Sequence, residues 1–135
     1  MKKKLLILIM PILFIGLNSS SCKDEDDPVH LKIKNNSNFS IYYALSYSYP
    51  DTALNRITDI PNDNENKTSK INANDSISVR TGFLAISPIT QMFIFDAKTI
   101  ENTPWDSIVK HNMVLKRYQL TKSDVKNSGW TITYP

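Results

Sequence analysis

Ser107 and His111 have the residue types and the spacing of a nucleophile and its base. They stand four positions apart in a segment that we expect to be helical, and residues at this spacing can touch on a helix surface. Catalysis by serine also needs a group that orients the base and donors that bind the oxyanion. No G-x-S-x-G motif occurs, and the chain has only three glycines. We therefore interpret both residues as part of a solvated helix face and expect no enzyme activity and no catalytic residue.

Metal binding is a second chemistry that the residue types allow. The two histidines, His30 and His111, are far apart in the chain, whereas a catalytic zinc site usually takes three protein ligands. A mixed site of histidine and carboxylates is an alternative that no spacing supports. One polar segment offers oxygen ligands for calcium, namely Asp59, Asp63, Asn64 and Glu65. Because this segment lacks the EF-hand spacing and its glycine, we interpret it as a polar loop and expect no cofactor.

The only cysteine, Cys22, stands between two contrasting segments. Before it, Lys2–Lys4 precede an apolar run over 5–17 and a small polar stretch over 18–21. This order is typical of a secretory signal peptide. The apolar run has 13 residues, fewer than the roughly 20 that a membrane-spanning helix needs. We therefore predict that residues 1–21 are a signal peptide.

The residues before Cys22 resemble the lipobox of bacterial lipoproteins. Ser20 and Ser21 match its small positions, whereas Ser19 departs from the larger residue that the pattern prefers. The resemblance implies that Cys22 is acylated and becomes the first residue of the mature chain. Two or more acyl chains anchor a protein stably to a membrane, and acylation also accounts for an odd cysteine in an exported protein. The alternative is plain secretion with a free thiol.

A charged run directly follows Cys22: Lys23, Asp24, Glu25, Asp26 and Asp27. A block of like charges is typical of a solvated tether, and we predict such a tether over residues 22–28. The run also resembles the export signal of Bacteroidota surface lipoproteins. This resemblance implies a lipid-anchored outer-membrane protein that faces the cell surface, with the periplasmic face as the alternative.

Three triplets of the form Asp-Ser/Thr-apolar resemble the O-glycosylation acceptors of exported Bacteroidota proteins. Their hydroxyl residues are Thr52, Ser76 and Ser107. Ordinary turn and cap chemistry is the alternative, because Asp and Ser side chains often bond to nearby backbone. Thr52 lies in a segment that we expect to be a loop, and it is therefore the best candidate.

Composition bounds the mature domain. The chain has 135 residues, and its 16 basic and 13 acidic side chains give a net charge of +3. Removal of the signal peptide takes away three lysines and no acid, which leaves the mature chain neutral. A nucleic-acid-binding protein usually shows a clustered basic excess, so we expect no nucleic-acid partner. Residues 29–135 suffice for a single domain.

The first half of the domain predicts two strands and a loop. Residues 29–34 alternate between apolar and polar, a turn cluster follows over 35–38, and residues 39–49 alternate again. Two such runs around a short turn favour a hairpin. In the second run Phe39 shares a face with Ile41, whereas Tyr42 falls on the polar face and is the best candidate for a surface aromatic residue. We expect residues 50–74 to be a loop.

The second half predicts more strands and two helices. Strands are expected over 76–80, 91–95, 113–120 and 130–134, and the apolar 91–95 is expected to be buried on both faces. Thr103 begins the first helix, over 104–112, and Thr121 begins the second, over 122–128. Gly129 suits the position after a helix end. We expect Trp105 and Trp130 to pack into the core.

These elements indicate a mostly β (β-sandwich-like) or α+β domain of five to seven short antiparallel strands with two short helices. Several segments, namely 93–97, 104–105, 115–118 and the ending Trp130–Pro135, look like those of a recurrent family of small Bacteroidota lipoproteins. That family has no assigned activity, so the resemblance carries no catalytic residue over to this chain. We expect a non-catalytic binding or accessory module with a glycan or an outer-membrane protein as its partner. The alternatives are a small envelope enzyme with a dispersed site and a structural partner of an outer-membrane complex.

Overall fold

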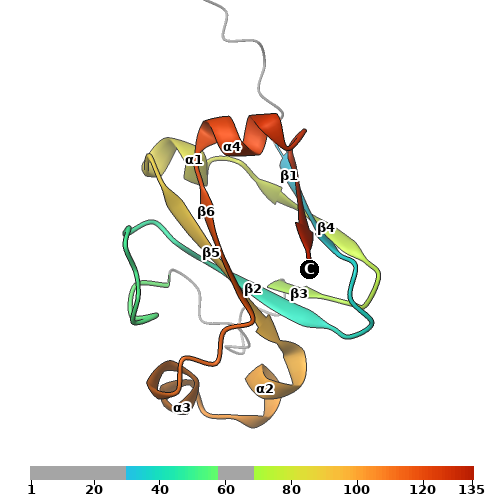
Figure 1. The fold of residues 1–135 in the computed structure, drawn as a ribbon, viewed down its shortest axis with the longest axis vertical. Helices are drawn as coiled ribbons and strands as arrows, with labels where there is room; N and C mark the ends of the chain where they lie inside the picture. Colours follow the sequence, from blue (N-terminus) through green and yellow to red (C-terminus); the bar gives the residue numbers. More distant parts are fainter. Residues whose placement is uncertain (1–29, 58–68) are drawn as a thin grey trace, which may run out of the picture.

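The computed structural model describes residues 30–57 and 69–135 (Figure 1). In this part of the chain it shows a β-rich α+β fold, as predicted. The strands are β1 (His30–Asn35), β2 (Ile41–Ser46), β3 (Lys70–Ile71), β4 (Ser76–Arg80), β5 (Thr90–Asp96), β6 (Lys116–Leu120) and β7 (Thr131–Tyr134). The helices are α1 (Phe83–Ile86), α2 (Ala97–Asn102), α3 (Trp105–Lys110) and α4 (Lys122–Asn127).

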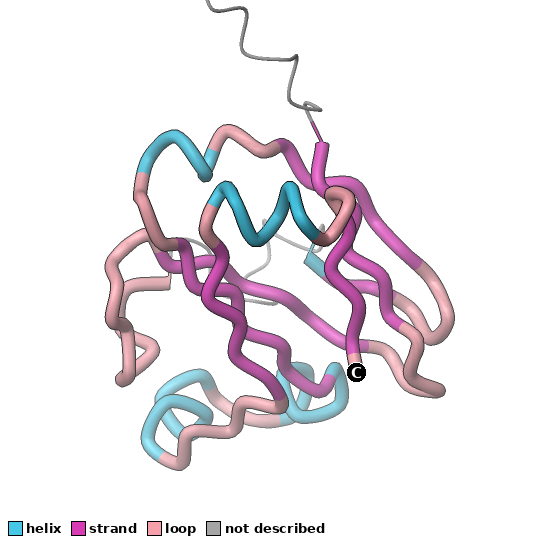
Figure 2. The backbone as a smooth tube through the Cα atoms, turned by 45° about the horizontal axis from the view of Figure 1, so that its top comes forward, coloured by secondary structure: helices cyan, strands magenta, loops and turns pink. Residues whose placement is uncertain are grey.

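The strands form two sheets. One has the order β4-β1-β7 and the other the order β3-β2-β5-β6. Four of the five strand pairs are antiparallel, but β1 and β7 run parallel, with Ile33 opposite Ile132. The expectation of antiparallel strands throughout is therefore wrong at this pair. α1 and α4 lie at one end of the two sheets, and α2 and α3 lie at the other (Figure 1, Figure 2).

The predicted hairpin of the first two strands is wrong. β1 pairs with β4 and β7, whereas β2 pairs with β3 and β5, so the two strands belong to different sheets. The alternating pattern of β1 indicates which of its faces is buried, but it does not determine which strands pair with it. β2 is buried on both faces and therefore needs a central place in a covered sheet, which pairing with β5 provides.

Two hydrophobic clusters hold the domain together. The first lies between the sheets: Leu31, Ile33, Ile41, Leu45, Ile71, Phe83, Met92, Ile94, Leu120, Val125, Ile132 and Tyr134. The second lies on the other face of β2 and β5, under α2, α3 and the chain after β2: Tyr42, Ala44, Leu54, Phe93, Phe95, Ala97, Ile100 and Ile108. β5 contributes to both clusters, which confirms that it is buried on both faces.

The second cluster explains why one aromatic prediction is wrong and two others hold. Tyr42 is only 2% exposed because α2 and the segment containing Leu54 cover the face that the serines of β2 suggested was open to solvent. Trp105 and Trp130 are partly buried against the two clusters. The core role predicted for both tryptophans is confirmed.

The observed helices agree only in part with those predicted from capping residues. Two short helices, α1 and α2, were not predicted. Thr103 ends α2 and does not begin α3, since its backbone N–H donates to Thr99 O at 3.0 Å. Pro104 is the N-cap of α3, one position before the first helical residue. α4 matches its prediction, because Thr121 and Asp124 form a reciprocal capping box.

The end of α4 has the hydrogen bonds of a Schellman motif. The N–H of Trp130 donates to Val125 O at 3.0 Å, and the N–H of Gly129 donates to Lys126 O at 3.1 Å. Gly129 has a φ of +64°. The motif turns the chain from α4 directly into β7.

We expect Gly129→Ala to lower the free energy of unfolding by about 1 kcal/mol, because a Cβ at this φ is strained. Gly82 is the matched control, since its φ is −52° and a Cβ there would meet no atom within 4 Å. Gly82→Ala should leave stability unchanged or raise it slightly. Urea unfolding of both variants measures the difference, and equal effects would contradict this account.

Among the helices that the structure describes, none is long and apolar enough to cross a membrane.

Candidate functional site

A cavity of 520 Å³ opens where the turn after β1, the strand β3 and the helix α2 meet. This size lies within the range of about 300–1,000 Å³ that is usual for small-molecule sites. We name it the Phe39 pocket. Its lining residues are Asn38, Phe39, Ser40, Lys70, Asp96, Ala97, Lys98 and Glu101.

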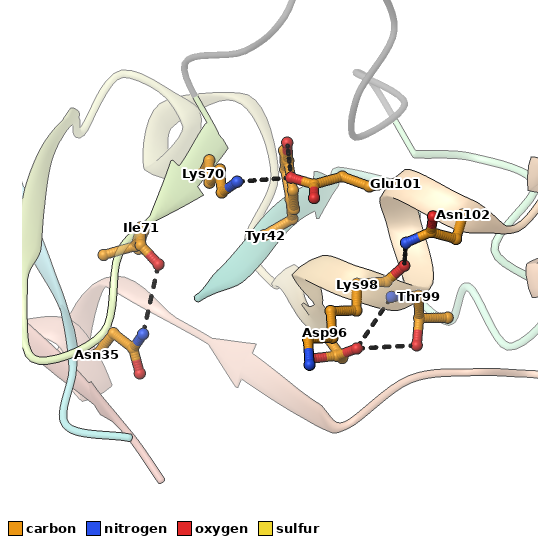
Figure 3. Close-up of polar contacts among 9 residues, drawn as sticks. All are labelled: Asn35, Tyr42, Lys70, Ile71, Asp96, Lys98, Thr99, Glu101 and Asn102. Carbon is orange, nitrogen blue, oxygen red and sulfur yellow. Dashed lines mark hydrogen bonds and ion pairs between the residues drawn. The ribbon is translucent and has the colours of Figure 1, made fainter. Parts of the chain in front are cut away.

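The buried side chain of Asn35 shapes the turn that forms one wall. Its Nδ2 donates to Phe39 O at 2.8 Å and to Asn72 O at 2.9 Å, and it also lies 3.4 Å from Ile71 O (Figure 3). Its Oδ1 accepts from the backbone N–H of Ser37 at 3.0 Å. One fully buried amide thus joins the turn after β1 to the segment after β3 and fixes the backbone at Phe39.

Phe39 presents an aromatic ring at the pocket. Its side chain is 38% exposed, although the alternating pattern predicted it in the buried face of a strand. The ring of Tyr134 packs edge-on against it, with centroids 6.3 Å apart. The two rings come from opposite ends of the described chain, so this contact depends on the parallel pairing of β1 with β7.

An ion pair forms another part of the lining (Figure 3). Lys70 Nζ lies 2.6 Å from Glu101 Oε1, and the hydroxyl of Tyr42 donates to the same oxygen at 3.2 Å. Lys70 Nζ also lies 5.8 Å from the centroid of the Tyr42 ring. Strands β2 and β3 and helix α2 therefore converge on one carboxylate.

Asp96, which also lines the pocket, caps the start of α2. Its Oδ2 accepts from the backbone N–H of Thr99 at 2.9 Å and from the hydroxyl of Thr99 at 3.0 Å. This N-cap begins the helix directly after β5. The short helix then places Lys98 and Glu101 at the cavity.

The ion pair in the pocket keeps Lys70 and Glu101 charged near neutral pH. The hydrogen bond from Lys70 holds the pKa of Glu101 below its usual value, and the same bond raises the pKa of Lys70. Burial, with the nearby carboxylate of Glu101, raises the pKa of Tyr42. A general acid or base works best with a pKa near the operating pH, and all three shifts lead away from neutrality. This arrangement suits recognition of a ligand better than proton transfer.

These shifts set the pH range in which the ion pair stabilises the fold. The pKa of Glu101 is lowered from 4.5 in the folded state, so its contribution is fully present above pH 4.5 and is lost as the pH falls through the lowered value. We expect a double-mutant cycle of Lys70→Gln and Glu101→Gln to give a coupling of less than about 1 kcal/mol at pH 7. Urea unfolding should show that coupling vanish in acid, and a constant coupling would contradict the assignment.

A second polar centre, which the sequence did not reveal, surrounds Asp51. This residue is 1% exposed, and its Oδ2 accepts from the backbone N–H of Arg56 at 3.0 Å. Its backbone N–H donates to Gln91 Oε1, and its carbonyl accepts from Arg117 at 3.2 Å. Among the described side chains, the buried atoms Ser46 Oγ, Asp51 Oδ1 and Thr90 Oγ1 have no hydrogen-bond partner.

The structure does not join the suggested serine–histidine pair. Ser107 is half-buried within α3, and His111 is exposed at its end. Within the described residues no side-chain hydrogen bond connects them; only the backbone N–H of His111 donates to Ser107 O, at 3.0 Å. The described part of the chain contains no group of three or more His, Cys, Asp or Glu side chains that could hold a metal ion. His30 is exposed on β1.

The three acceptor triplets have different surroundings. Thr52 is exposed outside the strands and helices, although the side chain of Asp51 before it is buried. Ser76 is half-buried in β4 opposite Lys34, and Ser107 lies within α3. Cys22, the charged run from Lys23 to Asp27 and the calcium candidates Asp59, Asp63, Asn64 and Glu65 lie outside the described residues.

No family model matches this chain, and no match was found among curated proteins or solved structures.

Proposed function

We propose that this protein is a lipid-anchored envelope lipoprotein whose single domain is a non-catalytic binding module. The binding half of the proposal rests on the Phe39 pocket, whose lining combines the exposed Phe39 with polar residues that include the Lys70–Glu101 ion pair. The anchoring half rests on Cys22 and the residues around it, which resemble a lipobox followed by a surface-export signal.

The course of β1 relates the anchor to the pocket. β1 begins at His30, beside α4, and ends at Asn35, where the turn of the Phe39 pocket starts (Figure 1). Six residues of strand span about 20 Å. The predicted tether over residues 22–28 therefore leads into the domain near the start of β1, at the end remote from the pocket. This supports an orientation in which the pocket faces away from the membrane.

Protease treatment of whole cells tests the location. We expect the domain to be cleaved on intact cells while a periplasmic marker survives, and we expect the intact mass of the protein to include acyl chains. A domain that is protected on intact cells would contradict surface exposure and favour the periplasmic face. A soluble product without acyl mass would contradict the anchor.

We also expect the exposed Thr52 to carry the O-glycan in the protein purified from its own envelope. Because the side chain of Asp51 is buried in the folded domain, modification should precede folding. Mass spectrometry of the peptide should show a sugar mass that Thr52→Ala removes, whereas Ser76→Ala should leave the total mass of glycan unchanged. An unmodified Thr52 peptide would contradict the assignment and leave the turn chemistry of Asp51 as the role of this triplet.

A further inference from the structure

We propose that the Phe39 pocket binds a neutral saccharide, an inference that rests on the proposed binding function and names its ligand class. The pocket combines one accessible aromatic ring with polar groups of both hydrogen-bonding kinds. Its 520 Å³ volume accommodates a ligand of the size of one or two sugar rings.

The ring of Phe39 supplies the apolar contact. A pyranose carries a face of C–H groups that packs on an aromatic ring, and this contact needs a ring that is both accessible and held in place. Phe39 is 38% exposed. Tyr134 supports it edge-on, at an interplanar angle of 76°, and Asn35 fixes its carbonyl oxygen. The ring is therefore positioned before any ligand arrives.

The polar lining supplies acceptors and donors for hydroxyl groups. Each carboxylate has one oxygen without a partner in the described chain, Oδ1 of Asp96 and Oε2 of Glu101, because the bonds of these groups use the other oxygen. Asn38 and Lys98 add donors. A sugar hydroxyl both donates and accepts, so neighbouring hydroxyls match a surface on which acceptors and donors alternate.

The charges of the pocket favour a neutral ligand. Two ammonium groups, Lys70 and Lys98, balance the carboxylates of Asp96 and Glu101. An anion would meet the two carboxylates, and a cation would meet the two ammonium groups. An extended peptide would need a strand edge to pair with, but the neighbouring edge strand β3 has only two residues. A neutral ring with several hydroxyl groups meets no like charge in the pocket and needs no strand edge.

The test uses the mature acylated protein in a zwitterionic detergent, because a glucoside detergent would compete for the pocket. Saturation-transfer NMR and calorimetry are run with the methyl glycosides of glucose, galactose, mannose and N-acetylglucosamine. We expect at least one to bind, and we expect Phe39→Ala to weaken it about tenfold or more, the loss typical of an anchoring residue. Glu101→Gln, which keeps the size of the side chain, should also weaken binding.

The matched control is Tyr49→Ala, because Tyr49 is an exposed aromatic residue, 44% exposed, that does not line the pocket. It should leave the affinity unchanged. Circular dichroism of each variant verifies the fold, and Phe39→Leu keeps an apolar side chain while it removes the aromatic face. Equal losses in Phe39→Ala and Tyr49→Ala would overturn the proposal.

Failure of the saccharide inference is distinguishable from failure of the binding function. If none of the four glycosides binds but short peptides or amino acids bind in a manner that Phe39→Ala abolishes, the saccharide inference is overturned and the binding module stands. If no ligand of any class binds at Phe39, both proposals are overturned.

Discussion

Asn35→Asp is expected to unfold the domain or to bring it close to unfolding. Asn35 is fully buried, and its Nδ2 donates to the carbonyl oxygens of Phe39 and Asn72. Aspartate has the same shape, but it places an oxygen where these two carbonyls need a donor. It also brings a charge into a site without a positive partner in the described chain.

The size of this effect follows from the unsatisfied groups. Each buried polar group that loses its partner costs about 1–3 kcal/mol, and a charged group costs more. We expect the free energy of unfolding to fall by about 4 kcal/mol or more, a large part of the total of about 5–15 kcal/mol that is usual for a domain. Urea unfolding followed by circular dichroism measures the loss.

The neighbouring residue provides the control. Asn36 has the same chemistry, but its side chain is exposed, so Asn36→Asp should change stability by less than about 0.5 kcal/mol. Asn35→Ala should fall between the two aspartate variants, because it removes the donors without adding a charge. If Asn35→Asp were as stable as Asn36→Asp, the amide would have no role in joining the turn to β3.

Cys22→Ser is expected to abolish lipid attachment. The lipobox resemblance implies that the thiol of Cys22 accepts the lipid, and serine would replace this sulfur nucleophile with a hydroxyl group. We expect labelled palmitate to enter the wild-type protein and to be absent from Cys22→Ser. The intact mass should lose the acyl chains at the same time.

Label incorporation is a better measure than membrane fractionation, because an uncleaved signal segment could itself hold the variant at the membrane. Ser21→Ala is the control, since it keeps a small residue before Cys22 and should leave labelling unchanged. Equal label in wild type and Cys22→Ser would contradict acylation at this residue. A wild-type protein without label would leave Cys22 as a free thiol of a secreted protein.

The Phe39 pocket shows why the candidate site was beyond sequence reasoning. Lys70 and Glu101 are separated by 31 positions, and Tyr42 and Glu101 by 59. No short motif links them, and α2, which carries Glu101, was itself not predicted. Asn35 was assigned to a turn by its residue type, but its burial depends on β3 and β7 closing around it.

The sequence by itself determined the features that local chemistry controls. The unbroken apolar run placed β5, the pairing of Thr121 with Asp124 placed the start of α4, and Gly129 marked its end. The residues around Cys22 led to the proposals about export and anchoring in the same way. In each case the interacting groups are within a few residues, so their spacing alone carries the information.

Only the tertiary structure decided which surfaces meet. The alternation in β1 indicated one buried face, but its partners proved to be β4 and β7. The burial of Tyr42 and the exposure of Phe39 both reversed the pattern-based expectation, because α2 covers one and the turn held by Asn35 displays the other. A sequence pattern indicates which face of an element is buried. The packing of distant segments determines which residues bury that face and where a pocket remains.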